Sequence, residues 1–234
     1  MLTGVRDLDF KILNKLDDND LVNVCKTNKQ ANNLCDDQGF WLQRIMIKFP
    51  YLGIDVLKKY KQNRSWSQYY IEDLRTITPS NANTKLITAS KSGRLDQVII
   101  AVNNGADIHA RNDESLRYAS IHGHLDAVKY LISQGADIHA RDNYSLRMAS
   151  VSGYLDVVKY LVEQGADIHA LNDYSLRMAS DYGHLEVVKY LVSQGGDIHA
   201  PDHVGPDASL RNARQHGHTA VSYTHLTLPT ILLV

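Results

Sequence analysis

The sequence has few of the residues that build disulfide frameworks, zinc sites or membrane spans. Only two of its 234 residues are cysteines, and Cys25 and Cys35 form no Cys-x-x-Cys pair. Neither a disulfide framework nor a zinc site is expected, and a reducing compartment fits best. No apolar run is long enough to span a membrane, and the first residues lack the apolar stretch of a signal peptide. We therefore expect an intracellular protein without a membrane partner.

Charge of either sign is not in excess, because 25 Lys and Arg residues stand against 26 Asp and Glu residues. Binding to nucleic acid normally requires a surplus of basic residues on one face, so no nucleic-acid partner is expected. The motifs of common active sites are also missing: there is no Gly-x-Ser-x-Gly, no phosphate-binding glycine loop and no His-Glu-x-x-His. We expect neither catalysis nor a cofactor.

What the sequence does contain is a motif that returns every thirty residues. Gly-Ala-Asp-Ile-His-Ala occupies 105–110, 135–140 and 165–170, and Gly-Gly-Asp-Ile-His-Ala occupies 195–200. A fixed period of about 20 to 50 residues indicates a solenoid, in which short units bury their apolar faces only by stacking on one another.

Each unit has the pattern of two helices separated by a glycine. In the third unit, Leu146 and Ala149 share one face of a short first helix. Gly153 is expected to end it, because glycine takes the left-handed conformation without a Cβ clash. A second amphipathic helix follows from Leu155, and Gly165 is expected to end that one. We call the polar segment between one unit's second helix and the next unit's first helix the finger.

These units resemble the ankyrin repeat. The resemblance rests on Gly-His-Leu-Glu-Val-Val at 183–188 and Gly-Ala-Asp at 165–167. The units are shorter than the usual ankyrin unit of about 33 residues, and Tyr-Ser-Leu-Arg or Glu-Ser-Leu-Arg replaces the familiar Thr-Pro-Leu-His. Short units of this type are similar to those of giant-virus and amoebal ankyrin proteins. The resemblance implies an all-α ankyrin solenoid of about five helix-turn-helix repeats, a monomer, and a location in the host cytoplasm or nucleus if the protein is viral.

The copies differ mainly in the fingers and first helices, which line the concave binding face of a solenoid. Tyr, Met and Arg are frequent there, and these residue types are enriched at interface cores and hot spots. We interpret the variable positions as a groove for a target protein; drift at exposed positions is the alternative. The predicted target-binding residues are Arg111, Glu114, Tyr118, His122, Arg141, Tyr144, Met148, Tyr174, Met178 and Tyr182.

Two further residue types recur once per unit. The histidines are His109, His139, His169 and His199, and the arginines are Arg117, Arg147 and Arg177. Stacked helices lie roughly 10 Å apart, whereas zinc ligands lie about 2 Å from one ion, so successive histidines cannot share a metal. We expect the histidines to tie the finger backbone together and the arginines to donate to finger carbonyls or finger acids, in preference to forming an anion-binding stripe.

Residues 8–45 show a different pattern, that of four short helices. The order resembles the F-box: a leucine-rich first helix, then Asp-Leu, then Val-Cys-Lys-x-Asn-Lys, then Phe-Trp before a basic helix, although Leu-Asp replaces the usual Leu-Pro opening. The resemblance implies binding to the Skp-type adaptor of cullin–RING ubiquitin ligases. The residues that would make this contact are Leu8, Ile12, Leu13, Leu16, Leu21, Val24, Cys25, Leu34 and Trp41. A plain helical cap on the first repeat is the alternative.

The expected organisation follows from these patterns. It comprises an F-box-like helical domain at 1–75, a linker at 76–83, ankyrin repeats at 84–219 and a tail at 220–234. The tail has no charged residue and resembles the translation of a transposase-type sequencing adapter, so we expect it to be non-native. Trp66, Tyr69, Tyr70 and Leu74 lie at helical spacing and predict a core stripe joining the two domains. Two functions remain open: a substrate-recruiting ubiquitin-ligase adaptor, or a stand-alone ankyrin module that sequesters a host protein.

Overall fold

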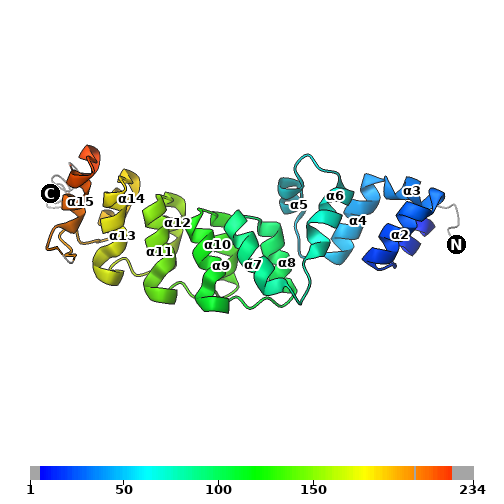
Figure 1. Cartoon of the computed structure of the whole chain (residues 1–234), viewed down its shortest axis with the longest axis horizontal. Helices are drawn as coiled ribbons and strands as arrows, with labels where there is room; N and C mark the ends of the chain where they lie inside the picture. The colour runs from blue at the N-terminus through cyan, green and yellow to red at the C-terminus, as the bar shows by residue number, and fades with distance from the viewer. Residues whose placement is uncertain (1–5, 203, 223–234) are drawn as a thin grey trace. The chain divides into compact units, whose positions relative to one another are not determined.

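A computed structural model describes residues 6–202 and 204–222, apart from the side chains of residues 6–8, 29 and 30. Every regular element within these residues is a helix, which confirms the predicted all-α fold (Figure 1). The chain divides into two compact units. The first comprises Met1–Lys85 and Leu95–Ala106, and the second comprises Leu86–Arg94 and Asp107–Val234.

The first unit holds the helices of the F-box-like segment together with the second helix of the first repeat. Its helices are α1 (Arg6–Leu13), α2 (Asp18–Thr27), α3 (Lys29–Cys35), α4 (Gln38–Lys48), α5 (Ile54–Lys61), α6 (Trp66–Glu72), the 3₁₀ turn η1 (Leu74–Thr76) and α8 (Leu95–Asn103). Acidic caps set where two of them begin. Asp17 accepts hydrogen bonds from the backbone N–H groups of Asn19 (2.9 Å) and Asp20 (2.8 Å), and Asp37 accepts one from Phe40 (3.0 Å). These carboxylates satisfy first-turn N–H groups that have no partner within the helix.

A buried arginine holds several segments of the first unit together. Arg44 of α4 is only 1% exposed. Its guanidinium donates to the carbonyl oxygens of Leu13, Asn14 and Leu16, the carboxylate of Asp18 and the hydroxyl of Tyr70. Burial of a cation costs stability unless it is paired and hydrogen-bonded in this way. The end of α1, the start of α2, α4 and α6 therefore meet at one side chain.

The Asp18 carboxylate in this network has a strongly perturbed pKa. Partial burial by itself raises the pKa, but hydrogen bonds from Lys48, Tyr70 and Arg44 outweigh that effect and lower the pKa from 3.8 to about 2. Burial and the hydrogen bond to Asp18 raise the pKa of the Tyr70 hydroxyl. The network is therefore built around an ionised Asp18 and a protonated Tyr70.

The two cysteines are bonded to each other, contrary to the expectation from their number and spacing. A disulfide joins Cys25 of α2 to Cys35 of α3. The chain turns back at Asn28, between the two helices, and brings the two Cα atoms to 5.8 Å, within the usual range for a disulfide. The cysteines therefore do not support the expectation of a reducing compartment.

The expected aromatic stripe forms part of the core of the first unit. Tyr69, Tyr70 and Leu74 are buried, while Trp66 is partly exposed. The hydroxyl of Tyr69 donates a hydrogen bond of 2.5 Å to the carboxylate of Asp96 at the start of α8, and α8 also contacts α5 and η1. The second helix of the first repeat is thus built into the same core as the N-terminal helices.

The second unit is a stack of helix pairs. Its helices are α7 (Ala82–Ser92, shared at its start with the first unit), α9 (Ala110–Ile121), α10 (Leu125–Ser133), α11 (Ala140–Ser152), α12 (Leu155–Glu163), α13 (Ala170–Asp181), α14 (Leu185–Ser193) and α15 (Ala208–Gln215). First helices pack on first helices along the series α9, α11, α13 and α15, and second helices pack likewise along α10, α12 and α14 (Figure 1). This order confirms the predicted solenoid.

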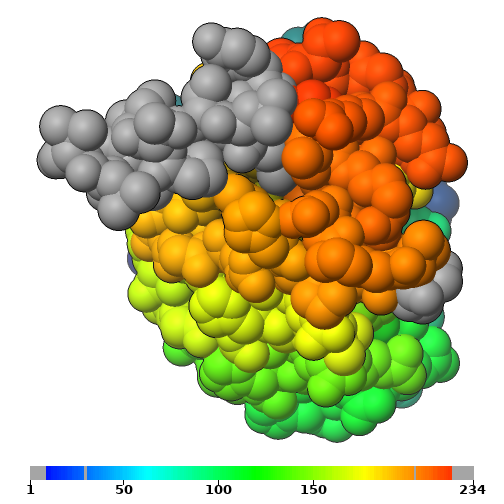
Figure 2. Space-filling view, turned by 90° about the vertical axis from the view of Figure 1, so that its left-hand side faces the viewer, coloured from blue at the N-terminus to red at the C-terminus, as the bar shows by residue number. Residues whose placement is uncertain are grey.

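The glycines end the helices as the sequence predicts. Gly153 follows α11 with φ of 78°, and Gly165 follows α12 with φ of 97°, both in the region that favours glycine. The red-orange residues of α15 lie at the end of the stack that faces the viewer in Figure 2, and α15 packs on α13. Of the segment expected to be a non-native tail, only 220–222 are described, and Val221 there is buried; the rest lies outside the described residues.

Candidate protein-binding surfaces

Three of the fingers turn the chain through three consecutive left-handed residues. In the third repeat these are Arg141, Asp142 and Asn143, with φ values of 53°, 56° and 56°. The same turn recurs at 111–113 and 171–173. Residues with a Cβ disfavour this conformation, although Asn and Asp tolerate it better than others. The turn therefore needs side chains that hold it in place.

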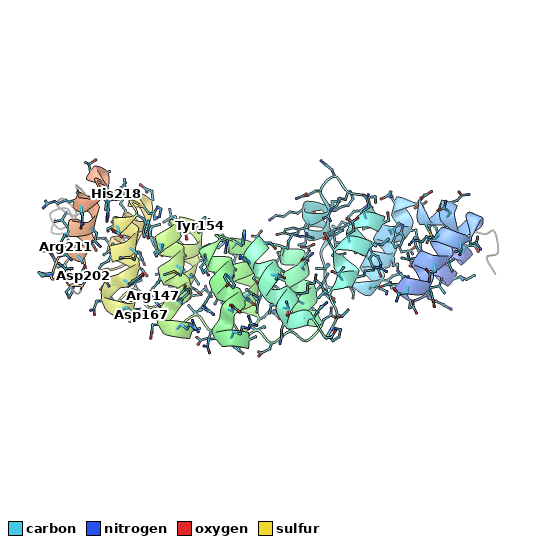
Figure 3. The ribbon with its side chains drawn as sticks, viewed as in Figure 1. Arg147, Tyr154, Asp167, Asp202, Arg211 and His218 are labelled. Carbon is cyan, nitrogen blue, oxygen red and sulfur yellow. A yellow bond between two sulfur atoms is a disulfide. The ribbon has the colours of Figure 1, made fainter. Side chains whose placement is uncertain are left out.

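The recurring arginines clamp this turn. Arg147 donates from Nε to the carbonyl oxygen of Asp142 and from Nη2 to that of Arg141, both at 2.9 Å. Arg117 and Arg177 make the equivalent pairs of bonds in their own repeats. The structure thus agrees with the expectation that these arginines donate to finger carbonyls. Figure 3 shows Arg147 at the finger end of α11.

The recurring histidines tie the fingers together, as expected. The backbone N–H of His139 donates to Asp137 (2.9 Å), and its ring Nδ1 lies 3.1 Å from Oδ1 of Asn143. That same oxygen accepts a hydrogen bond from the backbone N–H of Asp167 in the next finger, at 2.9 Å. We call this repeated bond from one finger to the next the finger relay; Asp113 and Asp173 make it in the neighbouring repeats.

Tyrosine rings fill the spaces between successive arginines. The guanidinium of Arg147 lies 5.3 Å from the ring centre of Tyr144 and 5.1 Å from that of Tyr174. Arg117 lies 5.3 Å from Tyr144, and Arg177 lies 5.5 Å from Tyr174. We call this alternating series the Arg–Tyr ladder. Cation–π contacts at these distances are favourable, so both tyrosines, which the sequence assigned to target binding, also support the stack.

The other predicted target-binding residues have different environments. Arg111, Arg141 and Tyr182 are exposed, and Arg111 also forms an ion pair with Glu114 at 3.2 Å. Four more are partly exposed along the first helices, namely Tyr118, His122, Met148 and Met178. Leu171 was not in the predicted set, yet it is 50% exposed in its finger. Leucine at this position, where the two preceding units have Arg111 and Arg141, was the sequence feature that could have identified it as a target-binding residue.

A second row of rings lies at the opposite end of the helix pairs, where Figure 3 labels Tyr154 and His218. Each ring covers the glycine that ends the first helix of the preceding repeat, so that a Cβ on Gly153 would lie 2.5 Å from the ring of His184. Nε2 of His184 also lies 2.8 Å from the carbonyl oxygen of Val151. These rings join neighbouring repeats, in agreement with a structural role.

The F-box-like residues divide into a core and a surface. Leu13, Leu21 and Trp41 are buried, which corrects their assignment to adaptor contact, because they have almost no surface to offer a partner. The residues that keep part of their surface are Ile12, Leu16, Val24, Cys25 and Leu34. The side chain of Leu8, in α1, lies outside the described residues.

A hollow of about 590 Å³ lies between α1 and α4. Its lining comprises Phe10, Lys11, Ile12, Asn14, Lys15, Gln43 and Ile47. Ile47 is 57% exposed, and the adjacent Met46 is 53% exposed. Ile47 is thus an exposed apolar side chain in the wall of the hollow.

Within the described chain, no group of three or more His, Cys, Asp or Glu side chains is arranged to hold a metal ion. None of the described helices combines the length and the apolar character that crossing a bilayer requires.

Comparison with known protein families agrees with this geometry. A family model described as ankyrin repeats (3 copies) matches residues 56–142, 86–172 and 142–202. A second model, described as the F-box domain, matches residues 10–43. A search of curated proteins found no match.

Proposed function

The chain belongs to the ankyrin-repeat family, and because it also carries an F-box domain, we propose that it is an adaptor that recruits a target protein to a cullin–RING ubiquitin ligase. Ankyrin repeats and F-boxes are both interaction domains, so the role is binding and not catalysis. The observation that carries the proposal is the presence of both domains in one chain. The F-box would bind a Skp-type adaptor, and the finger-and-first-helix face would select the target.

The surface of α1 and α4 supports adaptor binding. Ile47 is an exposed apolar side chain that lines the hollow, and the preceding residue of α4, Met46, is also exposed. Ile12 contributes a partly exposed side chain to the lining. Burial of such side chains against a partner is favourable, whereas leaving them in water is not. Lys11 and Lys15 flank the same hollow and would favour a partner with acidic residues.

The test uses the full chain and a purified Skp-type adaptor. Ile47→Asp places a charge on the exposed apolar surface without disturbing the core, so we expect it to abolish a complex that the unaltered chain forms at micromolar concentrations. Leu171→Asp is the matched control, because Leu171 is exposed to a similar extent but lies in an ankyrin finger. Absence of a complex with the unaltered chain would refute the ubiquitin-ligase role.

One observation favours the second candidate, a stand-alone ankyrin module with a helical cap. Helix α8 of the first repeat is part of the same compact unit as the N-terminal helices, and Tyr69 bonds to Asp96 within it. A terminal repeat needs a partner for its apolar face, which these helices supply. If the adaptor does not bind, this candidate remains, and target capture by the ankyrin repeats alone would support it.

A further inference from the structure

The segment that matches the F-box contains a covalent bond whose presence depends on redox conditions. The Cys25–Cys35 disulfide joins α2 to α3, and both cysteines lie within residues 10–43. We propose that this pair is a reversible dithiol–disulfide switch that orders α3 when oxidised and thereby strengthens binding of the Skp-type adaptor. The second half of this proposal rests on the proposed function.

Helix α3 packs on α2 and α4, and Asn28 caps its start, but few of its described side chains are buried. It has seven residues, and isolated helices so short are unstable in water. Ala31 and Cys35 are its buried side chains among those described, while Asn32 and Asn33 are exposed. Its first turn contains no acid and its last turn no base, so favourable interactions with the helix dipole are missing. A bond that fixes its last residue to α2 therefore has a large effect on its order.

The bond also connects α3 to the F-box core. Nε1 of buried Trp41 donates to the carbonyl oxygen of Cys35 at 2.5 Å. Oxidation fixes Cys35 with its carbonyl against α4, whereas reduction leaves this hydrogen bond to hold the end of α3. Val24 and Leu34 flank the bonded pair and are partly exposed. A surface that is already ordered binds a partner more tightly, since less freedom is lost on binding.

Small thiols can reach the pair. A hollow of about 220 Å³ is lined by both cysteines, with Lys26 and Asp36 also in its wall. Cys25 is partly exposed, whereas Cys35 is buried, so Cys25 is the sulfur that a reagent in solution meets first.

The chemistry is thiol–disulfide exchange with a small disulfide such as oxidised glutathione. The Cys25 thiolate attacks one sulfur of the small disulfide, forming a mixed disulfide and releasing one small thiol. The Cys35 thiolate then attacks the Cys25 sulfur, forming the internal bond and releasing a second small thiol. Two electrons pass from the protein to the small disulfide, and the two protons lost by the cysteines are taken up by the released thiols. Reduced glutathione reverses both steps.

The first experiment measures the pair directly in the full chain. The protein is equilibrated with defined ratios of oxidised to reduced glutathione and its free thiols are alkylated. Mass spectrometry of the intact chain then counts the alkylated thiols. We expect two thiols to be lost together and reversibly. Accumulation of a mixed glutathione disulfide without the internal bond would overturn the proposal.

The second experiment measures order in α3. Hydrogen exchange of the α3 amides should be about tenfold or more slower in the oxidised chain, because the cross-link restricts the opened state. The double variant Cys25→Ser/Cys35→Ser should exchange like the reduced chain at every glutathione ratio, and the amides of α11 should not change. Equal exchange in the two redox states would refute the ordering step.

The third experiment separates this proposal from the proposed function. Adaptor affinity should be about tenfold higher for the oxidised chain, a difference of about 1.4 kcal/mol, and the double serine variant should bind weakly in both states. Equal affinity in both states overturns the switch while the adaptor role stands. Binding in neither state refutes the adaptor role, and the first two experiments then decide the redox pair by themselves.

Discussion

The hydroxyl of Tyr69 donates a hydrogen bond to the carboxylate of Asp96, and both residues are buried. The corresponding acids of later repeats, Asp126, Asp156 and Glu186, are exposed on their second helices. In the first repeat, the acid at this position is therefore buried against α6, whereas in the later repeats it lies at the surface. This contact makes the N-terminal helices part of the stability of the first repeat, whether or not they also bind an adaptor.

Removal of this hydroxyl should destabilise the first unit. Tyr69→Phe deprives a buried carboxylate of one of its donors, and we expect a loss of about 1 to 3 kcal/mol in the free energy of unfolding. Chemical denaturation monitored by tryptophan fluorescence would measure it, because both tryptophans lie in that unit. Tyr182→Phe, which removes a hydroxyl from an exposed tyrosine, should have no measurable effect. Equal stability of both variants would contradict this account.

The Asp18 network predicts a loss of stability in acid. Because folding lowers the pKa of Asp18 from 3.8 to about 2, the folded state favours the ionised carboxylate. Its contribution is fully present above about pH 4 and is lost as the pH falls toward 2. Asp18→Asn should therefore be less stable than the unaltered chain at pH 7, and the difference should shrink between pH 4 and pH 2. A difference independent of pH in that window would show that the carboxylate charge is not what matters.

The rings over the glycines predict unequal effects of two similar substitutions. Gly153→Ala and Gly165→Ala both place a Cβ on a residue with positive φ, which costs about 1 to 2 kcal/mol. Only Gly153 lies under a ring, that of His184, while nothing lies near a Cβ on Gly165. We expect Gly153→Ala to cost about 1 to 3 kcal/mol more. Thermal unfolding measures both, and adding His184→Ala should remove most of the difference.

The Arg–Tyr ladder predicts that ring faces matter and hydroxyl groups do not. Tyr144→Phe keeps a ring between Arg117 and Arg147, so the free energy of unfolding should change little. Tyr144→Leu removes two cation–π contacts and should cost about 1 to 2 kcal/mol. Arg147→Lys should also be destabilising, since an ammonium group cannot reproduce the two carbonyl bonds and the stacked plane together. If Phe and Leu at position 144 are equally stable, the ladder contributes nothing.

The contacts within the repeats could be predicted from the sequence because each of them recurs in successive units. The thirty-residue period in the sequence predicts the glycines that end helices, the structural histidines and the clamping arginines. The Arg–Tyr ladder could also have been found, because Tyr-Ser-Leu-Arg recurs in adjacent units at 144–147 and 174–177. The left-handed turn left a trace as well, in the Asn and Asp residues of each finger.

Contacts that occur only once in the chain could not be predicted from the sequence. The burial of Asp96 depends on where α6 meets α8, and no pattern within either helix indicates it. The Cys25–Cys35 disulfide depends on the turn between α2 and α3, and the number of cysteines does not predict that turn. For the same reason Leu13, Leu21 and Trp41 were assigned to a partner when they belong to the core: an apolar face has the same spacing whether another helix or another protein covers it.

The finger relay has a consequence for how such a chain changes over generations. The backbone N–H of Asp167 donates to the side chain of Asn143, and one period earlier the N–H of Asp137 donates to the side chain of Asp113. Deletion of one whole interior repeat would bring equivalent atoms of the two flanking repeats together, so that the finger relay forms again between them. The contacts between repeats therefore do not depend on the number of repeats. A gene that gains or loses whole interior repeats by unequal recombination still encodes a protein in which each pair of neighbouring repeats forms the finger relay.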